Sequence, residues 1–251
     1  MRLQYPWFDQ WAEFVVDPLG TTVWISWSAS VFWEEVSELF LGPVFSSVLS
    51  QRGQTCLHAG VVRIRERGLA VVGPKGSGKS TLSLALIRCG GALVSDDVAV
   101  LGERGGHLTV PVGAPRLRIL RDSAEALGGS FDELEPVWER DREDDRKRYL
   151  EVPAAQPSSE GAVTLDAVYF LGERSSTHHV SSIRHLRSIE ALPRLMANRH
   201  MVHVLNRDAH TRDFRTLSRL ARAVRLGEIE RPEDLSSIER CADDILADLG
   251  A

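Results

Sequence analysis

The sequence predicts an α/β fold, with a mixed sheet and flanking helices. Short β-rich runs alternate with helical patterns, a glycine-rich loop joins a strand to a helix at 73–80, and helical patterns dominate after residue 188. With 251 residues, 43% of them apolar, the chain is long enough to bury its own core. We expect an N-terminal segment, residues 1–52, packed on a main domain, residues 53–251, as one compact unit.

The N-terminal segment is aromatic and β-rich. Five of the six tryptophans lie within the first 33 residues. We interpret them as core packing rather than as an aromatic ligand site. The expected elements are strands at 13–16 and 21–27 joined by a turn, a helix from Ser30 to Phe40, a break at Gly42–Pro43 and a short helix to about Ser50.

The middle of the chain predicts strands separated by one helix, which Gly90 and Gly91 end. The expected strands are 56–64, 69–72, 92–95, 98–101, 107–112 and 116–120, with a hairpin turn at 65–68 and the helix at 79–89.

The second half begins with a charged run and ends in helices. The run at 138–148 balances its signs, which is typical of a solvated helix turn or an exposed loop. After it we expect a linker at 153–161, a buried strand at 163–171 with its partner at 179–186, and helices at 189–198, 211–223 and 232–249, the last with a proline in its first turn.

Composition excludes several classes of protein. A net charge of −5 provides no overall basic field for nucleic acid or an anionic membrane. No apolar run reaches the roughly 18 to 20 residues of a membrane span, and the first residues lack a signal-peptide pattern. Cys56, Cys89 and Cys241 have neither disulfide-framework nor zinc-site spacing. We therefore expect a cytoplasmic protein with no nucleic-acid or membrane partner.

The chemistry lies in the glycine-rich loop. Residues 73–80 match G-x-x-x-x-G-K-[ST] between an apolar strand and a helix, which predicts a P-loop nucleotide site for ATP and Mg²⁺. Lys79 should neutralise the β- and γ-phosphates, and the Ser80 hydroxyl should bind Mg²⁺. Lys79 is one of only three lysines, with Lys75 and Lys147, in a chain that otherwise uses arginine. The predicted nucleotide contacts are Gly73, Pro74, Lys75, Gly76, Ser77, Gly78, Lys79, Ser80 and Thr81.

Two adjacent acids follow the next predicted strand. Asp96 and Asp97 come 17 residues after Lys79, so a strand returning from the loop's own helix can bring them beside the phosphates. One acid would then hold Mg²⁺ while the other accepts a proton from an incoming hydroxyl. We assign the metal to Ser80 and Asp97, but which acid is the base stays open. A simple Asp-Asp turn is the alternative.

These motifs resemble the catalytic domain of HPr kinase/phosphorylase. The similarity covers about residues 55–102: Leu57-His58-Ala59-Gly60-Val61, the loop, and Gly90 to Asp97. It implies a P-loop fold shared with phosphoenolpyruvate carboxykinase. It also implies catalytic roles for His58, near the transferred phosphate, and for Lys79, Asp96 and Asp97.

A closer likeness is to the short HPr kinase-like proteins of peptide natural-product (RiPP) pathways, including lasso-peptide kinases. It rests on the Leu-His-Ala lead-in, the Gly-Lys-Ser-Thr-Leu loop end and Pro115-Arg116-Leu117-Arg118. The likeness implies phosphorylation of a hydroxyl, in the lasso-peptide kinases a serine, on a peptide or small protein. Arg116 and Arg118 are then candidates for contacting substrate or phosphate, or else ordinary surface residues.

Other readings remain open. The loop also suits an ATPase or nucleotide-dependent switch acting on a partner, or a small-molecule kinase. The choice of ATP or GTP, any phosphorylase activity and homo-oligomer formation are undetermined. Histidines 178, 179, 200 and 203 lack a neighbouring carboxylate or thiol to complete a metal site, so we expect packed or exposed side chains. Cys89 is interpreted as a small apolar residue.

Overall fold

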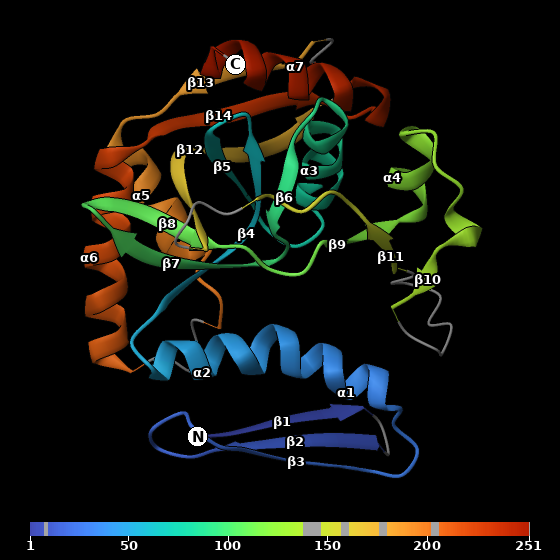
Figure 1. Ribbon diagram of the computed structural model, residues 1–251, viewed down its shortest axis with the longest axis vertical. Coiled ribbons are helices and arrows are strands. Elements are labelled where there is room, and N and C mark those ends of the chain that lie inside the picture. The colour runs from blue at the N-terminus through green and yellow to red at the C-terminus, as the bar shows by residue number, and fades with distance from the viewer. Residues whose placement is uncertain (8–9, 138–146, 157–160, 176–179, 202–205, 251) are drawn as a thin grey trace.

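The computed structural model of the protein describes residues 1–7, 10–137, 147–156, 161–175, 180–201 and 206–250. A central mixed sheet carries helices on both faces, and a smaller N-terminal sheet lies below it in Figure 1. The predicted α/β class with a mixed sheet and flanking helices is thereby confirmed.

The central sheet combines parallel and antiparallel neighbours. Its order is β13-β14-β12-β5-β4-β7-β8, with β6 beside β4 and the start of β12 also paired with β8. Among the described strands, β12 runs parallel to its neighbours β5 and β14, so these three strands end at one edge. The strands are β4 (Thr55–Ile64), β5 (Arg67–Val72), β6 (Ala92–Ser95), β7 (Val98–Arg104), β8 (His107–Pro111), β12 (Ala162–Ser175), β13 (Ser182–His185) and β14 (Arg225–Pro232).

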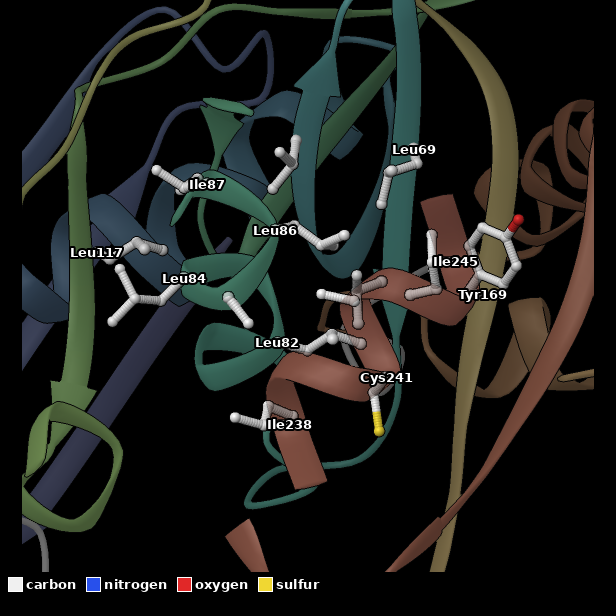
Figure 2. Close-up of a cluster of buried hydrophobic side chains, with 14 of the residues drawn as sticks. Leu69, Leu82, Leu84, Leu86, Ile87, Leu117, Tyr169, Ile238, Cys241 and Ile245 are labelled. Atoms are coloured by element: carbon white, nitrogen blue, oxygen red, sulfur yellow. The ribbon is translucent and has the colours of Figure 1, made fainter. Parts of the chain in front are cut away.

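Alternation along the strands divides the core into two layers. Leu69 and Val71 of β5 face a cluster shared with α3 (Lys79–Arg88) and α7 (Ile238–Leu249), shown in Figure 2. Their neighbours Ala70 and Val72 face a second cluster, shared with α5 (Ser188–Ala197) and α6 (Arg207–Ala223). Both faces of β5 are therefore covered, which makes the strand that leads into the loop rigid.

A peripheral sheet packs beside α3. Its order is β10-β11-β9, with α4 and a 3₁₀ turn between β9 and β10. Lys147 and Arg148, the end of the predicted charged run, begin strand β11 because they pair with β9; residues 138–146 of that run lie outside the described residues. The elements are β9 (Arg116–Leu120), α4 (Arg121–Ala126), η2 (Phe131–Glu133), β10 (Glu135–Pro136) and β11 (Lys147–Glu151).

The N-terminal segment forms its own small core. The sheet β1-β2-β3 packs under the helices, and β1 escaped the sequence analysis. The predicted helix start at Ser30 and break at Gly42–Pro43 are wrong: a π-helical turn absorbs Pro43, which has no N–H to donate, and the chain stays helical. The elements are β1 (Arg2–Trp7), β2 (Gln10–Val16), β3 (Val23–Trp27), α1 (Trp33–Leu39), η1 (Phe40–Val44) and α2 (Phe45–Gln51). The domain division at residue 52 stays a prediction.

Contrary to the prediction of core packing, several tryptophans are exposed. Trp11, Trp24 and Trp33 are 45%, 58% and 55% exposed. Strand alternation puts the smaller side chains of β2, such as Ala12 and Phe14, on the buried face, and it leaves Trp11 on the opposite one.

The C-terminal third differs from prediction in its strands. The expected partner of β12, strand β13, pairs instead with β14, which the sequence analysis missed. Pro232 ends β14 rather than opening a helix, so the last helix begins at Ile238, after a short 3₁₀ turn, η4 (Leu235–Ser237). Helix α6 begins earlier than predicted because Asn206 caps it by accepting from the Ala209 N–H at 2.8 Å.

The predicted linker at 153–161 is partly paired. Leu93 of β6 donates to the carbonyl of Pro153 and accepts from Ala155, each at 2.8 Å, so residues 153–155 lie along that strand. Residues 157–160 lie outside the described part of the chain.

All three cysteines are free: Cys56 and Cys241 are buried, and Cys89, interpreted from the sequence as a small apolar residue, is exposed. Among the described helices, none has the length and apolar character needed to span a bilayer.

Gly68 tests the packing of β5 against β12. A methyl group there would meet the Thr164 carbonyl oxygen at 2.2 Å, so Gly68→Ala should lower the free energy of unfolding by about 1–3 kcal/mol. The control is Gly113→Ala, whose methyl would lie 3.5 Å from its nearest neighbour and should change stability by less than about 0.5 kcal/mol. Urea denaturation measures both; equal effects would contradict the tight strand approach.

Candidate nucleotide-binding site

The loop between β5 and α3 curls around the Lys79 ammonium. Gly76 and Gly78 have φ values of 78° and 94°, a region that favours glycine. Lys79, the first residue of α3, donates from Nζ to the carbonyls of Gly73 at 2.9 Å and Pro74 at 3.1 Å. Burial lowers the pKa of Lys79, while the charges of Asp97 and Asp96 oppose that shift. The cation is thus held inside the loop, facing the acids.

The remaining loop residues differ in where their side chains lie. Pro74, Lys75 and Gly76 are exposed. Thr81 is buried, and its hydroxyl lies 2.7 Å from the Ser123 hydroxyl of α4. Of the predicted contact residues, Thr81 can therefore offer a nucleotide its backbone N–H but not its side chain.

Asp96 follows β6 and faces Ser80. Ser80 Oγ lies 3.4 Å from Asp96 Oδ1, and Asp96 Oδ2 accepts from the Arg118 backbone N–H at 3.1 Å. Burial raises the pKa of Asp96, and the Arg118 charge acts against it. The structure thus places Asp96, rather than Asp97, next to Ser80, although the metal was assigned to Ser80 and Asp97 from the sequence.

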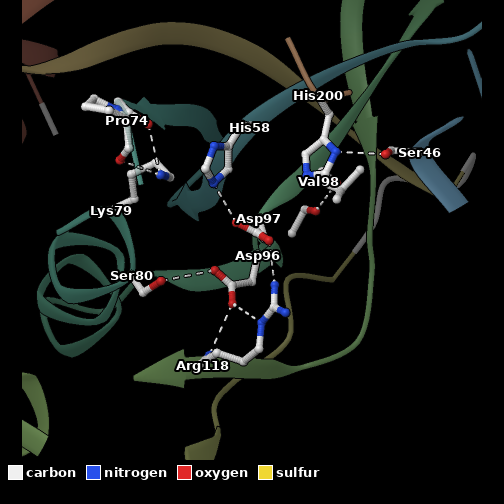
Figure 3. A network of polar contacts seen from close by, with 12 residues as sticks. Ser46, His58, Pro74, Lys79, Ser80, Asp96, Asp97, Val98, Arg118 and His200 are labelled. Atoms are coloured by element: carbon white, nitrogen blue, oxygen red, sulfur yellow. Dashed lines mark hydrogen bonds and ion pairs between the residues drawn. The ribbon is translucent and has the colours of Figure 1, made fainter. Parts of the chain in front are cut away.

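Asp97 turns the other way, toward His58 and Arg118 (Figure 3). Its Oδ1 lies 2.7 Å from His58 Nε2, and its Oδ2 accepts from Arg118 Nη2 at 2.8 Å. A backbone φ of 68°, uncommon for a residue other than glycine, separates the directions of the two acids. Burial alone would raise the pKa of Asp97, but the His58 hydrogen bond and the Arg118 charge hold it well below its ordinary value.

Arg118 and Arg116, two residues apart on β9, lie in different surroundings. Arg118 contacts both acids and also donates from Nη1 to Glu38 Oε2 of α1 at 2.6 Å. Arg116 is exposed and donates to Glu151 at 2.5 Å. The two side chains share one face of β9, but only Arg118 reaches the acids, because Arg116 lies one pair further along the strand and pairs with Glu151.

The N-terminal segment supplies residues that the sequence analysis missed. Glu38 binds Arg118 and accepts from the Tyr149 hydroxyl. Ser46 of α2 lies 2.8 Å from His200 Nδ1, and the His200 ring meets the His58 ring edge-on with centroids 5.7 Å apart. No local pattern marks these residues, because contacts across more than 75 positions bring them together.

A cleft of about 560 Å³ opens beside the acid pair. Its wall includes Asp96 and Arg118, and it extends over apolar surface from the N-terminal helices and from the β7–β8 region. The apolar lining residues are Leu41, Phe45, Val98, Val100, Pro111, Val112 and Ala114. The cleft is accessible and partly apolar, so it can receive a side chain or a short segment of another molecule.

Ser80 and Asp96 fit the magnesium ion that the loop implies. Among the described residues, no three His, Cys, Asp or Glu side chains form a metal cage. Mg²⁺ at nucleotide sites instead uses one or two carboxylates, a hydroxyl and phosphate oxygens. Asp96 Oδ1 and Ser80 Oγ, 3.4 Å apart, would supply that hydroxyl and carboxylate. His178, His179 and His203 lie outside the described residues, and His200 is engaged by Ser46.

Comparison with known proteins finds similarity to solved structures, among them an HPr kinase/phosphatase. The HPr(Ser) kinase/phosphatase from Coxiella burnetii has 15% sequence identity to this chain and a TM-score of 0.39; the match covers 78% of this chain and 99% of that one. No protein-family model matches the chain, and no curated protein matches it.

His200 predicts a pH dependence of stability. Burial lowers the pKa of His200 from 6.5 to about 4, while the charge of Asp97 opposes the shift. Between pH 6.5 and pH 4 the imidazole of His200 is protonated in the unfolded chain but neutral in the folded protein. The free energy of unfolding therefore decreases as the pH falls toward 4. We expect a loss of about 2 kcal/mol between pH 7 and pH 5.

Because Asp96 and Asp97 also titrate, the measurement is the difference between variants. Urea unfolding at several pH values should give a shallower slope for His200→Asn than for the natural protein. His107→Asn, at an exposed position on β8, should leave the slope unchanged. Identical slopes for all three proteins would contradict a neutral, half-buried His200.

Proposed function

We propose that the protein is an ATP-dependent, Mg²⁺-dependent kinase that transfers the γ-phosphoryl group to a hydroxyl, a serine hydroxyl in our assignment, of a peptide or small protein. One observation carries the proposal: the loop residues Lys79 and Ser80 face Asp96 and Asp97 across a short gap, with Ser80 Oγ and Asp96 Oδ1 3.4 Å apart. A P-loop with acids at this distance has the parts that phosphoryl transfer requires.

The binding steps belong to the loop and Asp96. The backbone amides of the loop and the N-terminus of α3 attract the phosphates. Lys79 moves its ammonium from the Gly73 and Pro74 carbonyls to phosphate oxygens, which a compact point charge can do. Ser80 and Asp96 would hold Mg²⁺, which when bound neutralises charge on the phosphates.

The transfer step belongs to Asp97 and its partners. Its side chain is 32% exposed, against 11% for Asp96, so Asp97 is the acid that an incoming hydroxyl can reach. The acceptor oxygen forms a bond to the γ-phosphorus as the bond to the β–γ bridging oxygen breaks, and Asp97 takes the hydroxyl proton. His58 and Arg118 orient Asp97, and His58 would also contact a phosphate oxygen, as the resemblance to HPr kinases implies.

The cleft supports a peptide acceptor. It meets the network at Arg118, the residue that contacts both acids, and its apolar lining suits the side chains that flank a phosphorylated residue. The sequence likeness to kinases of natural-product precursor peptides points to the same acceptor class. Exposed Arg116, which also lines the cleft, is then a candidate for contacting an acidic substrate group.

Substitutions at the loop and at the acid pair separate binding from transfer. Lys79→Ala and Lys79→Arg should weaken ATP binding at least about tenfold, the second because a guanidinium does not fit the loop that holds the ammonium. Asp97→Asn should keep ATP affinity within about threefold but lower the transfer rate by about 10²–10⁴-fold. Calorimetry measures binding, and γ-labelled ATP with a candidate precursor peptide measures transfer.

The same assays discriminate the alternatives. Asp96→Asn should reduce the dependence of ATP affinity on Mg²⁺, whereas Asp97→Asn should not. Equal loss of nucleotide affinity in all the variants would mean that the acids are structural. ATP hydrolysis without transfer to any hydroxyl-bearing peptide from the gene neighbourhood would favour an ATPase or switch.

Phe45 tests the cleft as the acceptor site. Phe45 is 42% exposed and lines the cleft, so Phe45→Ala should raise the KM for the peptide about tenfold, through lost apolar contact, and leave the KM for ATP unchanged. Leu19→Ala is the control, because Leu19 is 73% exposed and lies outside the cleft. An unchanged peptide KM in the Phe45 variant would place the acceptor elsewhere.

A further inference from the structure

Arg231 is a buried cation that the proposed chemistry does not use. It lies near the end of β14 and is only 3% exposed. Its Nη2 donates to the Ser77 carbonyl, and its Nε is buried without a hydrogen-bond partner. Within the described part of the chain, no carboxylate forms an ion pair with it. A buried charge in this condition is costly unless an anion joins it.

A second arginine approaches the same point. A methyl group built on Gly78 would lie 3.1 Å from Arg231 Nη1 and 3.2 Å from Arg174 Nη2. Arg174 is exposed, near the end of β12. Burial, reinforced by the Arg174 charge, lowers the pKa of Arg231 to about 10. Two guanidinium groups therefore converge on the start of α3.

Topology gives this pair a defined place relative to the acids. The strands β5, β12 and β14 are parallel, so the loop, Arg174 and Arg231 lie at one edge of the sheet, where α/β proteins bind ligands. The acids follow β6, on the β4 side of β5, and the arginines come from the β12 side. The loop thus has carboxylates on one flank and guanidinium groups on the other.

This asymmetry orients a bound nucleotide. The γ-phosphate belongs beside Ser80, Asp96 and Asp97 if the protein is the kinase proposed above. The phosphate chain passes through the loop, so its nucleoside end emerges on the opposite flank, beside Arg174 and Arg231. We propose that these two arginines bind the phosphate nearest the nucleoside, forming an anion subsite for nucleoside mono-, di- and triphosphates. The inference rests on the proposed nucleotide-binding function.

The test compares ligands that differ by one phosphate. Calorimetry of the full chain with adenosine and AMP should show AMP binding at least about tenfold more tightly, and Arg174→Ala or Arg231→Gln should remove that difference. Both variants should weaken ADP binding about tenfold. Arg231→Lys should restore part of it, because the charge remains. Arg222→Ala, at an exposed site on α6, is the control: it removes a charge and should leave AMP and ADP affinity unchanged.

The outcomes separate this inference from the kinase proposal. If the arginine variants bind AMP and ADP as the natural protein does, or lose adenosine, AMP and ADP affinity equally, then Arg231 only holds the Ser77 carbonyl and the inference is overturned. Because Arg231→Gln removes a buried group, circular dichroism must show a folded protein, and exposed Arg174 gives the independent variant. Arginine-dependent AMP and ADP binding without phosphoryl transfer would sustain the inference and reject the kinase.

Discussion

The candidate site depends on how one guanidinium balances three carboxylates. Arg118 contacts Asp96, Asp97 and Glu38, each from a different direction. Without that cation, adjacent acids in a largely buried position would repel each other and take up protons. With it, Asp97 stays ionised, while Asp96 keeps one oxygen directed at Ser80. The two acids thus acquire different environments, although they are neighbours in the chain.

The same guanidinium joins the N-terminal segment to the candidate site. Glu38 comes from α1, and Ser46 from α2 holds His200 against His58. A segment with its own small core therefore contributes polar groups to a site built on another sheet. Residues of this segment, such as Leu41 and Phe45, also form one wall of the cleft. Packing of this segment and the chemistry of the acids are coupled through two hydrogen-bonded contacts.

The loop lies between two flanks of opposite character. On one side are the acids with Arg118; on the other are Arg174 and Arg231, which have no acidic partner among the described residues. A phosphate chain is polar along its length, with a metal-binding, reactive end and a nucleoside end. The order of strands around β5 places the acids and the arginines on opposite flanks. The acids follow β6, on the β4 side of β5, and the two arginines lie on β12 and β14, on the other side.

The sequence by itself determined the loop, the strand and helix around it, and the acid pair, because these depend on local spacing and on glycine's backbone freedom. It did not distinguish Arg118 from Arg116: both lie on the same face of β9, and only the tertiary structure pairs Arg118 with the acids and Arg116 with Glu151. Strand β14, the pairing of β13, and the exposure of the tryptophans were decided by tertiary packing. Glu38, Ser46, His200 and Arg231 joined the site only through contacts between distant segments, which no local pattern records.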